Sequence, residues 1–147
     1  MKTAIIYYSK HHENTKKLLD AIHDNYDVTL IDALNPSTTD LAEFDLIGFA
    51  SGIYFSKFHE SVCEYAKKYL PKGKKVFFIF TCGSLKKTYT DDIKDAIKDK
   101  NATIVGTYHS FGYDTYGPFK LIGGLKRKHP NQKEIDGAVQ FFRSISR

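Results

Sequence analysis

Three polar side chains stand where a buried strand is expected to give way to a helix. Ser9 follows the apolar run 4–8, and Asn14 and Thr15 precede a stripe of apolar residues with helical spacing. A strand–loop–helix junction presents unpaired backbone N–H groups and the positive end of a helix dipole. Together with these side-chain donors, the junction has the chemistry to bind a phosphate monoester. Asn14 and Thr15 would also suit plain helix capping, which needs no ligand.

A second candidate segment, residues 51–59, is rich in large apolar side chains. It follows the apolar run 46–50 and reads Ser-Gly-Ile-Tyr-Phe-Ser-Lys-Phe-His. We expect a surface loop here, in which aromatic side chains cover a planar heterocycle by stacking. The alternative is that Ile53 and Phe58 fold back onto the core.

Two further segments follow strand-like runs. Residues 81–84, Thr-Cys-Gly-Ser, offer hydroxyl groups and a glycine that lets a ligand approach the backbone closely. Residues 109–131 form a long irregular stretch rich in Gly, Tyr and Lys. Stretches of that length within a compact domain are usually functional or disordered.

Several other chemistries are disfavoured because their motifs are missing. The chain has neither the GxxxxGK[ST] loop of nucleotide hydrolases nor the glycine triplet of dinucleotide folds. Its aspartates and histidines lack triad or metal-site spacing, so we predict no catalytic residue and no metal ligand. Cys63 and Cys82 lack CxxC spacing, and we expect reduced, packed thiols rather than a disulfide.

The alternation of apolar runs with helical stripes predicts the scaffold that brings these segments together. Buried strands are expected at residues 4–8, 28–31, 46–50, 76–80 and 103–108. Helical stripes lie at residues 18–22, 58–69, 93–97 and 135–145, with Asp91 or Asp92 as the cap of the third. This pattern predicts a doubly wound α/β fold, a parallel sheet with helices on both faces. Ligands bind such sheets at the carboxyl ends of the strands.

The composition is that of an ordinary globular domain. The chain has 147 residues, 41% hydrophobic and 27% charged, and we expect one domain over residues 1–147. It shows no membrane-length apolar run and no signal-peptide pattern, so we expect a cytoplasmic location and no membrane partner.

The net charge of +5 is unevenly distributed. Much of the excess comes from Lys120, Lys126, Arg127, Lys128 and Lys133. A basic cluster of this kind attracts acidic partners, although it can also be only a solvated surface.

Taken in order, these segments resemble the FMN-binding loops of the flavodoxin family. The resemblance rests on Tyr8–Thr15, on Gly52–Phe55 and on residues 81–84. The run Gly112–Phe119 is similar to a segment of short flavodoxin-like proteins of bacteria and archaea. The resemblance covers essentially the whole chain. It implies a five-stranded sheet in the order 2-1-3-4-5, non-covalently bound FMN and low-potential electron transfer.

The resemblance also implies roles for individual residues. Ser9, Asn14 and Thr15 would hold the phosphate, Tyr54 would stack on the isoalloxazine, and residues 81–83 would approach its pyrimidine edge. The complete set expected to bind FMN is Ser9, Lys10, His11, His12, Asn14, Thr15, Ser51, Gly52, Ile53, Tyr54, Phe55, Thr81, Cys82, Gly83 and Tyr113.

The chain departs from the family pattern in four places. Its first loop is one residue longer, with Glu13 where a glycine usually precedes the Asn-Thr pair, and that carboxylate must point away from a phosphate. Phe55 and Ser56 occupy the region where the family often has a glycine after the stacking aromatic. The chain has no tryptophan to stack on a flavin, and it is basic where most flavodoxins are acidic.

Three functions fit these observations. We favour an electron carrier that shuttles electrons between redox partner proteins, acidic ones docking near Lys120–Lys133, without being a stand-alone enzyme. The second is an FMN-dependent reductase or oxidase of the quinone or porphyrinogen type, in which residues 109–131 gate a pocket for an anionic substrate. The third is a binding module without flavin, although nucleic acid is a disfavoured partner.

Overall fold

The elements alternate along the chain in the computed structural model, which describes residues 1–10, 14–35, 39–111 and 130–147. The strands are β1 (Thr3–Tyr8), β2 (Val28–Asp32), β3 (Leu46–Tyr54), β4 (Lys57–Phe58), β5 (Lys75–Cys82) and β6 (Thr103–Phe111). The helices are α1 (Asn14–Asn25), α2 (Glu60–Tyr69), α3 (Asp91–Ala96) and α4 (Gln132–Ile145), with a short 3₁₀ turn at Leu41–Glu43.

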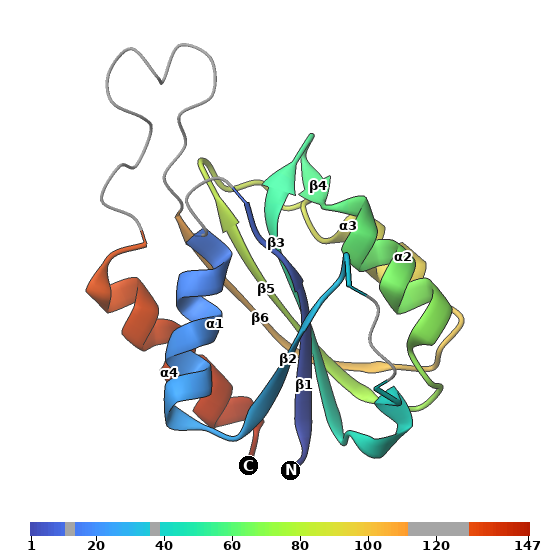
Figure 1. Ribbon diagram of the computed structural model, residues 1–147. Helices are drawn as coiled ribbons and strands as arrows, with labels where there is room; N and C mark the ends of the chain where they lie inside the picture. Colours follow the sequence, from blue (N-terminus) through green and yellow to red (C-terminus); the bar gives the residue numbers. More distant parts are fainter. Residues whose placement is uncertain (11–13, 36–38, 112–129) are drawn as a thin grey trace.

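Parallel pairing places the five long strands in the order β2-β1-β3-β5-β6. This is the predicted order 2-1-3-4-5, with one addition: the two-residue strand β4 pairs antiparallel with β3. Helices α1 and α4 cover one face of the sheet, and α2 and α3 cover the other (Figure 1). The predicted doubly wound α/β fold is therefore confirmed.

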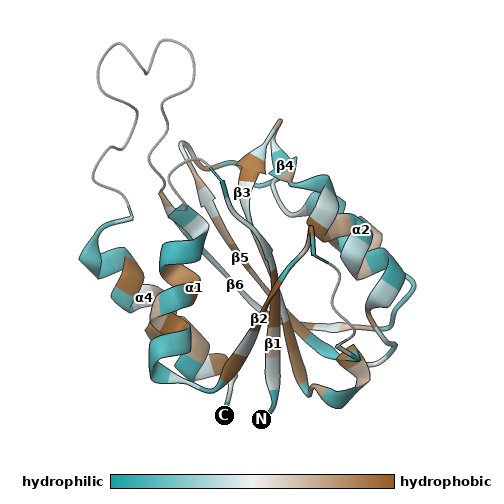
Figure 2. Cartoon of the chain, viewed as in Figure 1, coloured by the Kyte–Doolittle hydropathy of each residue, from teal (hydrophilic) through white to brown (hydrophobic). Residues whose placement is uncertain are grey.

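The central strands supply both hydrophobic cores. Phe49 and Phe78 pack on the side of α2, whereas Phe77 and Ile79 pack on the side of α1 and α4. Burying a side chain of this size contributes about 1.5–3 kcal/mol. Gly48 makes room for this packing, because a Cβ atom there would collide with the Phe77 ring. Figure 2 shows the same arrangement, with hydrophobic colour along the strands and polar colour on the outer helix surfaces.

The segment after residue 50 differs from expectation. Residues 51–54, predicted to lie in a surface loop, continue β3: Ser51 pairs with Tyr8 of β1, and Gly52 pairs with Thr81 of β5. Phe58, predicted to lie on a helix, belongs to β4 and is fully buried. The reason is a tight hairpin, which the alternation of apolar residues alone does not reveal.

The cap of one helix differs from expectation, and the cap of another was not predicted. The N-cap of α3 is Thr90, which makes no side-chain capping hydrogen bond, so neither Asp91 nor Asp92 caps that helix. At α4, Asn131 accepts from the backbone N–H of Glu134, and the Glu134 carboxylate accepts from the backbone N–H of Asn131. This reciprocal capping box fixes the start of the last helix.

Candidate functional site

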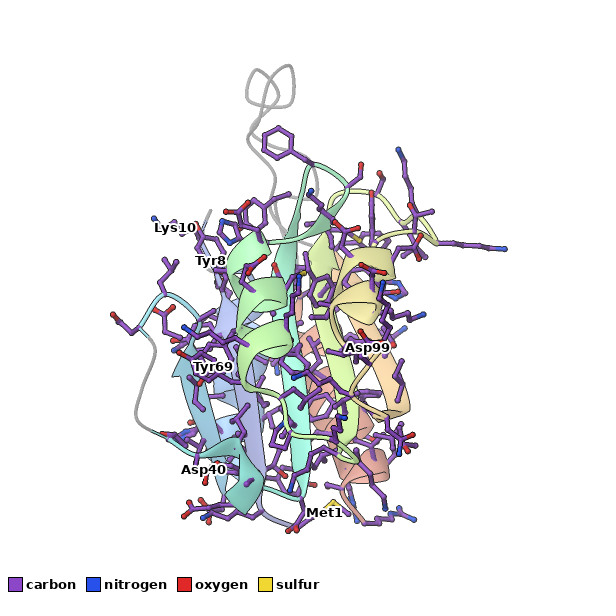
Figure 3. The ribbon with its side chains drawn as sticks, turned by 90° about the vertical axis from the view of Figure 1, so that its right-hand side faces the viewer. Met1, Tyr8, Lys10, Asp40, Tyr69 and Asp99 are labelled. Atoms are coloured by element: carbon purple, nitrogen blue, oxygen red, sulfur yellow. The ribbon has the colours of Figure 1, made fainter. Side chains whose placement is uncertain are left out.

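The carboxyl ends of β1, β3, β5 and β6 meet at one edge of the sheet. In Figure 3, Tyr8 and Lys10 lie at this edge, and Met1 and Asp40 lie at the opposite end of the molecule. Ligands of doubly wound sheets bind at such an edge, next to the strand from which the chain winds in both directions. Here that strand is β1, and its neighbour β3 carries the predicted aromatic segment.

The start of α1 brings together hydroxyl groups from two distant parts of the chain. Ser9 Oγ accepts from the backbone N–H of Lys16 at 3.2 Å. Thr15 is 1% exposed, and its Oγ1 lies 2.9 Å from Oγ1 of Thr81 at the end of β5. Asn14 is also buried in the first turn of the helix. The edge therefore combines helix N-terminal amides with polar side chains, the chemistry of an anion site.

Ser51 is committed to internal hydrogen bonds. Its side chain is fully buried, accepts from the backbone N–H of His59 at 3.0 Å and donates to the carbonyl of Gly52 at 2.5 Å. The hydroxyl ties the end of β3 to the start of α2. Its one proton is therefore in use, and the hydroxyl could offer a ligand only its second acceptor lone pair.

Tyr54 is partly exposed, and its neighbours hold it in place. Its hydroxyl accepts from the backbone N–H of Lys10 at 3.4 Å, and its ring lies over Gly52. The ring also makes edge contacts with Tyr8 at 5.4 Å and His59 at 5.3 Å between centroids. Burial raises the pKa of the Tyr54 hydroxyl, while the Lys10 amide acts in the opposite direction. Tyr54 therefore links the first loop to β3.

Phe55 is the opposite case, with a side chain that is 97% exposed. It forms a two-residue turn with Ser56 between the paired residues Tyr54 and Lys57. Both turn residues have positive φ, 52° and 66°. This is the geometry of a tight hairpin turn that normally selects Asn and Gly. The preceding residue, Ile53, is partly buried against the core.

At the end of β5, the cysteine thiol packs into the core. Cys82 is 5% exposed and lies in the core, with Sγ 4.0 Å from the carbonyl of Ser110. Gly83 is half-buried, and residues 84–88 after it are exposed. Of the predicted trio at residues 81–83, only Thr81 places a polar side chain beside another predicted site residue.

His59 was missed by sequence reasoning, and it packs against Tyr8 and Tyr54, the last residues of β1 and β3. Its ring stacks on Tyr8 with 3.6 Å between centroids and 7° between planes. Its Nδ1 accepts from the backbone N–H of Ser61 at 3.1 Å and so caps α2. The available signal was a potential acceptor side chain directly before Glu60 in the expected first turn.

The end of β6 is fastened to α4: residues 109–111, predicted to begin an irregular stretch, continue the strand because they pair with β5. The Glu134 carboxylate accepts from the backbone N–H of Phe111 at 2.8 Å, and the Tyr108 hydroxyl donates to the Glu134 carbonyl at 2.6 Å. Gly137 permits this contact, because a Cβ atom there would collide with the Tyr108 hydroxyl. The end of β6 is thereby held beside the start of α4.

Several predicted residues lie outside the described part of the chain: His11, His12, Tyr113, Lys120, Lys126, Arg127 and Lys128. Lys133 is described and is exposed on the first turn of α4. Across residues 1–10, 14–35, 39–111 and 130–147, no three His, Cys, Asp or Glu side chains gather in a way that could hold a metal ion. Over the same residues, no helix is long and apolar enough to cross a membrane.

Known proteins resemble this chain both in sequence and in fold. The chain is 42% identical to an uncharacterized protein of Methanocaldococcus jannaschii, over 99% of this chain and 98% of that protein. Its fold matches a flavodoxin from the domain Archaea with a TM-score of 0.68 and 16% identity, over the full length of both chains. It also matches a flavoprotein of Lactobacillus acidophilus solved in complex with FMN, with a TM-score of 0.58 and 20% identity, over 74% of this chain and 92% of that one.

The family assignment follows from a direct match at the level of sequence. The model of the flavodoxin domain matches residues 5–112, which run from within β1 to one residue past the end of β6. The matched region contains the start of α1, the hairpin after β3 and the end of β5, the three segments that meet at the edge described above. The chain belongs to the flavodoxin family.

Proposed function

We propose that the protein binds FMN at the carboxyl edge of its sheet and carries electrons between partner proteins. The observation that supports this most is that a helix N-terminus with polar side chains and an exposed aromatic ring lie at the same edge of the sheet. Ser9, Asn14 and Thr15 stand at the start of α1, and Phe55 stands on the neighbouring hairpin. A phosphate and a planar heterocycle joined in one ligand would use both features.

The donor set fits the phosphate of FMN. Of the two hydroxyls in the Thr15–Thr81 pair, one donates to the other. The second hydroxyl proton can then be donated to a phosphate or ribityl oxygen. The N-terminal amides of α1 add donors and a favourable dipole for an anion. The exposed side chain of Lys10 adds a positive charge nearby.

Phe55 is better placed than Tyr54 to cover the ring system. Tyr54 is fixed by Lys10, Tyr8 and His59, whereas Phe55 is almost fully exposed. A ligand that covers an exposed apolar ring removes more apolar surface from water, and this burial favours binding. FMN supplies one- and two-electron chemistry when bound, so the chain needs only to hold, orient and shield it.

We also propose that the partners are acidic redox proteins that dock near Lys120–Lys133. The support is the basic character of that segment together with the overall net charge of +5. Opposite charges on two proteins raise their rate of association, and salt weakens the effect.

The first test compares FMN with riboflavin, which lacks the phosphate. The double variant Asn14→Ala/Thr15→Ala should lose about 1–3 kcal/mol of FMN affinity, the loss expected for hydrogen bonds to a charged group. Riboflavin affinity should hardly change. The matched control, Asn25→Ala/Thr29→Ala, removes the same side-chain types at the far end of α1 and on β2. Equal losses for both flavins would place the phosphate elsewhere.

A second test separates the carrier from an enzyme on the same fold. The loaded protein should exchange electrons rapidly with an acidic redox protein. It should show little turnover of NAD(P)H with a small quinone alone. Rapid turnover of that pair without a protein partner would favour the reductase instead.

A further inference from the structure

We propose that His59 is a positioning residue whose neutral form holds the two flavin loops together, so that flavin affinity falls as His59 takes up a proton. This inference rests on the proposed function, because it assigns regulation to the same edge. The evidence for this inference is the set of contacts that the His59 side chain and backbone make.

The first contacts join His59 to α2 and to β3. Nδ1 accepts from the backbone N–H of Ser61 at 3.1 Å and lies 2.8 Å from its hydroxyl. The backbone N–H of His59 donates to Ser51 Oγ, which in turn donates to the Gly52 carbonyl. The same residue thus fixes the start of a helix and the end of the strand that carries the aromatic hairpin.

The second contacts join His59 to the loop after β1. The imidazole stacks face to face on Tyr8, and Tyr54 packs its edge against both rings. Tyr54 then accepts from the backbone N–H of Lys10. A continuous path therefore runs from the helix cap, through three rings, to the first loop of the proposed phosphate site.

The hydrogen bonds determine which protonation state this arrangement requires. Because Nδ1 accepts from a backbone N–H, the neutral ring carries its proton on Nε2. A second proton on Nδ1 would face the Ser61 N–H, and that bond would be lost. The contact with the Ser61 hydroxyl could reverse its direction, whereas the contact with the amide could not. A positive charge would also stand at the positive end of the α2 dipole.

The surroundings agree with a preference for the neutral ring. Burial lowers the pKa of His59; the Glu60 carboxylate opposes this, and the Lys10 ammonium adds to it. The rings of Tyr8 and Tyr54 also face the imidazole. A lowered pKa in the folded state means that the stabilisation is complete above the unfolded value near 6.5. It is lost as pH falls through the lowered folded value.

The variants separate titration from capping. His59→Asn keeps a side-chain acceptor for the helix cap but cannot take up a proton. His59→Ala removes the cap as well. His23→Asn is the matched control, because His23 is exposed in the last turn of α1.

The experiment uses two readouts on the same proteins between pH 7.5 and 5.0. Without flavin, the backbone amide signals of Lys10 and Ser61 should titrate together in the wild type and in His23→Asn, but not in His59→Asn. With riboflavin, whose lack of phosphate removes the titration of FMN itself, wild-type affinity should fall about three- to tenfold. This corresponds to a change of roughly half to one pKa unit on binding. His59→Asn should lose this dependence.

The outcomes distinguish this inference from the proposed function. If the Lys10 signal does not move while Ser61 titrates, the link between the helix cap and the first loop is overturned. If riboflavin affinity has the same pH profile in the wild type and in His59→Asn, the regulatory role is overturned. If no flavin binds at pH 7.5, the proposed function fails, and with it the regulation of flavin affinity, whatever the Lys10 signal does.

Discussion

The two-residue turn between β3 and β4 holds backbone strain that one substitution should release. Phe55 and Ser56 have φ values of 52° and 66°. The left-handed region costs a residue with a side chain about 1–2 kcal/mol. Glycine avoids this cost, but it loses more conformational entropy on folding, which lowers the gain in stability by about 0.5–1 kcal/mol. Ser56→Gly should therefore raise the free energy of unfolding by about 0.5–1 kcal/mol.

Thermal unfolding followed by circular dichroism measures this gain. For a chain of this size, 1 kcal/mol corresponds to about 2–4 °C, so Tm should rise by about 1–4 °C. Asn101→Gly is the matched control: Asn101 has φ 51°, but asparagine tolerates this region, so the gain should be smaller. Gly73→Ala, at φ +80°, should lower Tm because it introduces the same strain. If Ser56→Gly raises Tm no more than Asn101→Gly, the reasoning is refuted.

Three further predictions concern the ring, the basic segment and a thiol. Phe55→Ala should weaken flavin binding by about 1 kcal/mol and raise the residual flavin fluorescence. Tyr54→Leu should have a smaller effect on both flavin affinity and flavin fluorescence. A larger effect in Tyr54→Leu than in Phe55→Ala would show that Tyr54 is the stacking ring. Changing all three residues 126–128 to Glu should slow electron exchange with an acidic partner at low salt and leave Tm nearly unchanged. If the salt dependence of the exchange rate does not change, the segment is only a solvated surface. Burial is the main cause, and a nearby aspartate the second, that raises the pKa of the Cys63 thiol to about 11. At pH 8, iodoacetamide should therefore alkylate Cys63 at least about tenfold more slowly than it alkylates the thiol of free glutathione. Equal labelling rates would contradict that assignment.

The fold was predictable because its main signals are local. Apolar runs such as residues 76–80 indicate buried parallel strands, and helical stripes between them leave few ways to wind the chain. The end of β3 was not predictable by this route. Residues 51–54 extend the strand because they pair with β1, β5 and β4, and those partners are distant in sequence or joined by an unusual turn.

The candidate site was predictable in its location but not in the orientation of its side chains. Topology alone places residues 9–15 and 81–83 at the same edge, and Thr15 and Thr81 do meet there. Whether a side chain points to the edge or into the core depends on tertiary contacts. The Ser51 hydroxyl is hydrogen-bonded to the backbone N–H of His59, eight residues later. The Cys82 thiol packs in the core against the carbonyl of Ser110.

His59 shows the limit of single-residue reasoning. In sequence, a histidine before a helix can be recognised as a candidate cap, but nothing there shows that its ring also packs on other aromatic side chains. Its role emerges only when β1 brings Tyr8 beneath its ring and the hairpin brings Tyr54 to its edge. The combination of a cap and a three-ring cluster is a property of the folded chain.

The position of FMN is the central claim, and backbone amide signals recorded during an FMN titration test it most directly. We predict the largest shifts at residues 9–16, 52–56 and 81–84, and we predict that riboflavin reproduces them except near the start of α1. Residues at the opposite end of the sheet, such as Asp45 and Lys74, should not respond. Shifts concentrated at that opposite end, or no response to FMN anywhere, would contradict the account.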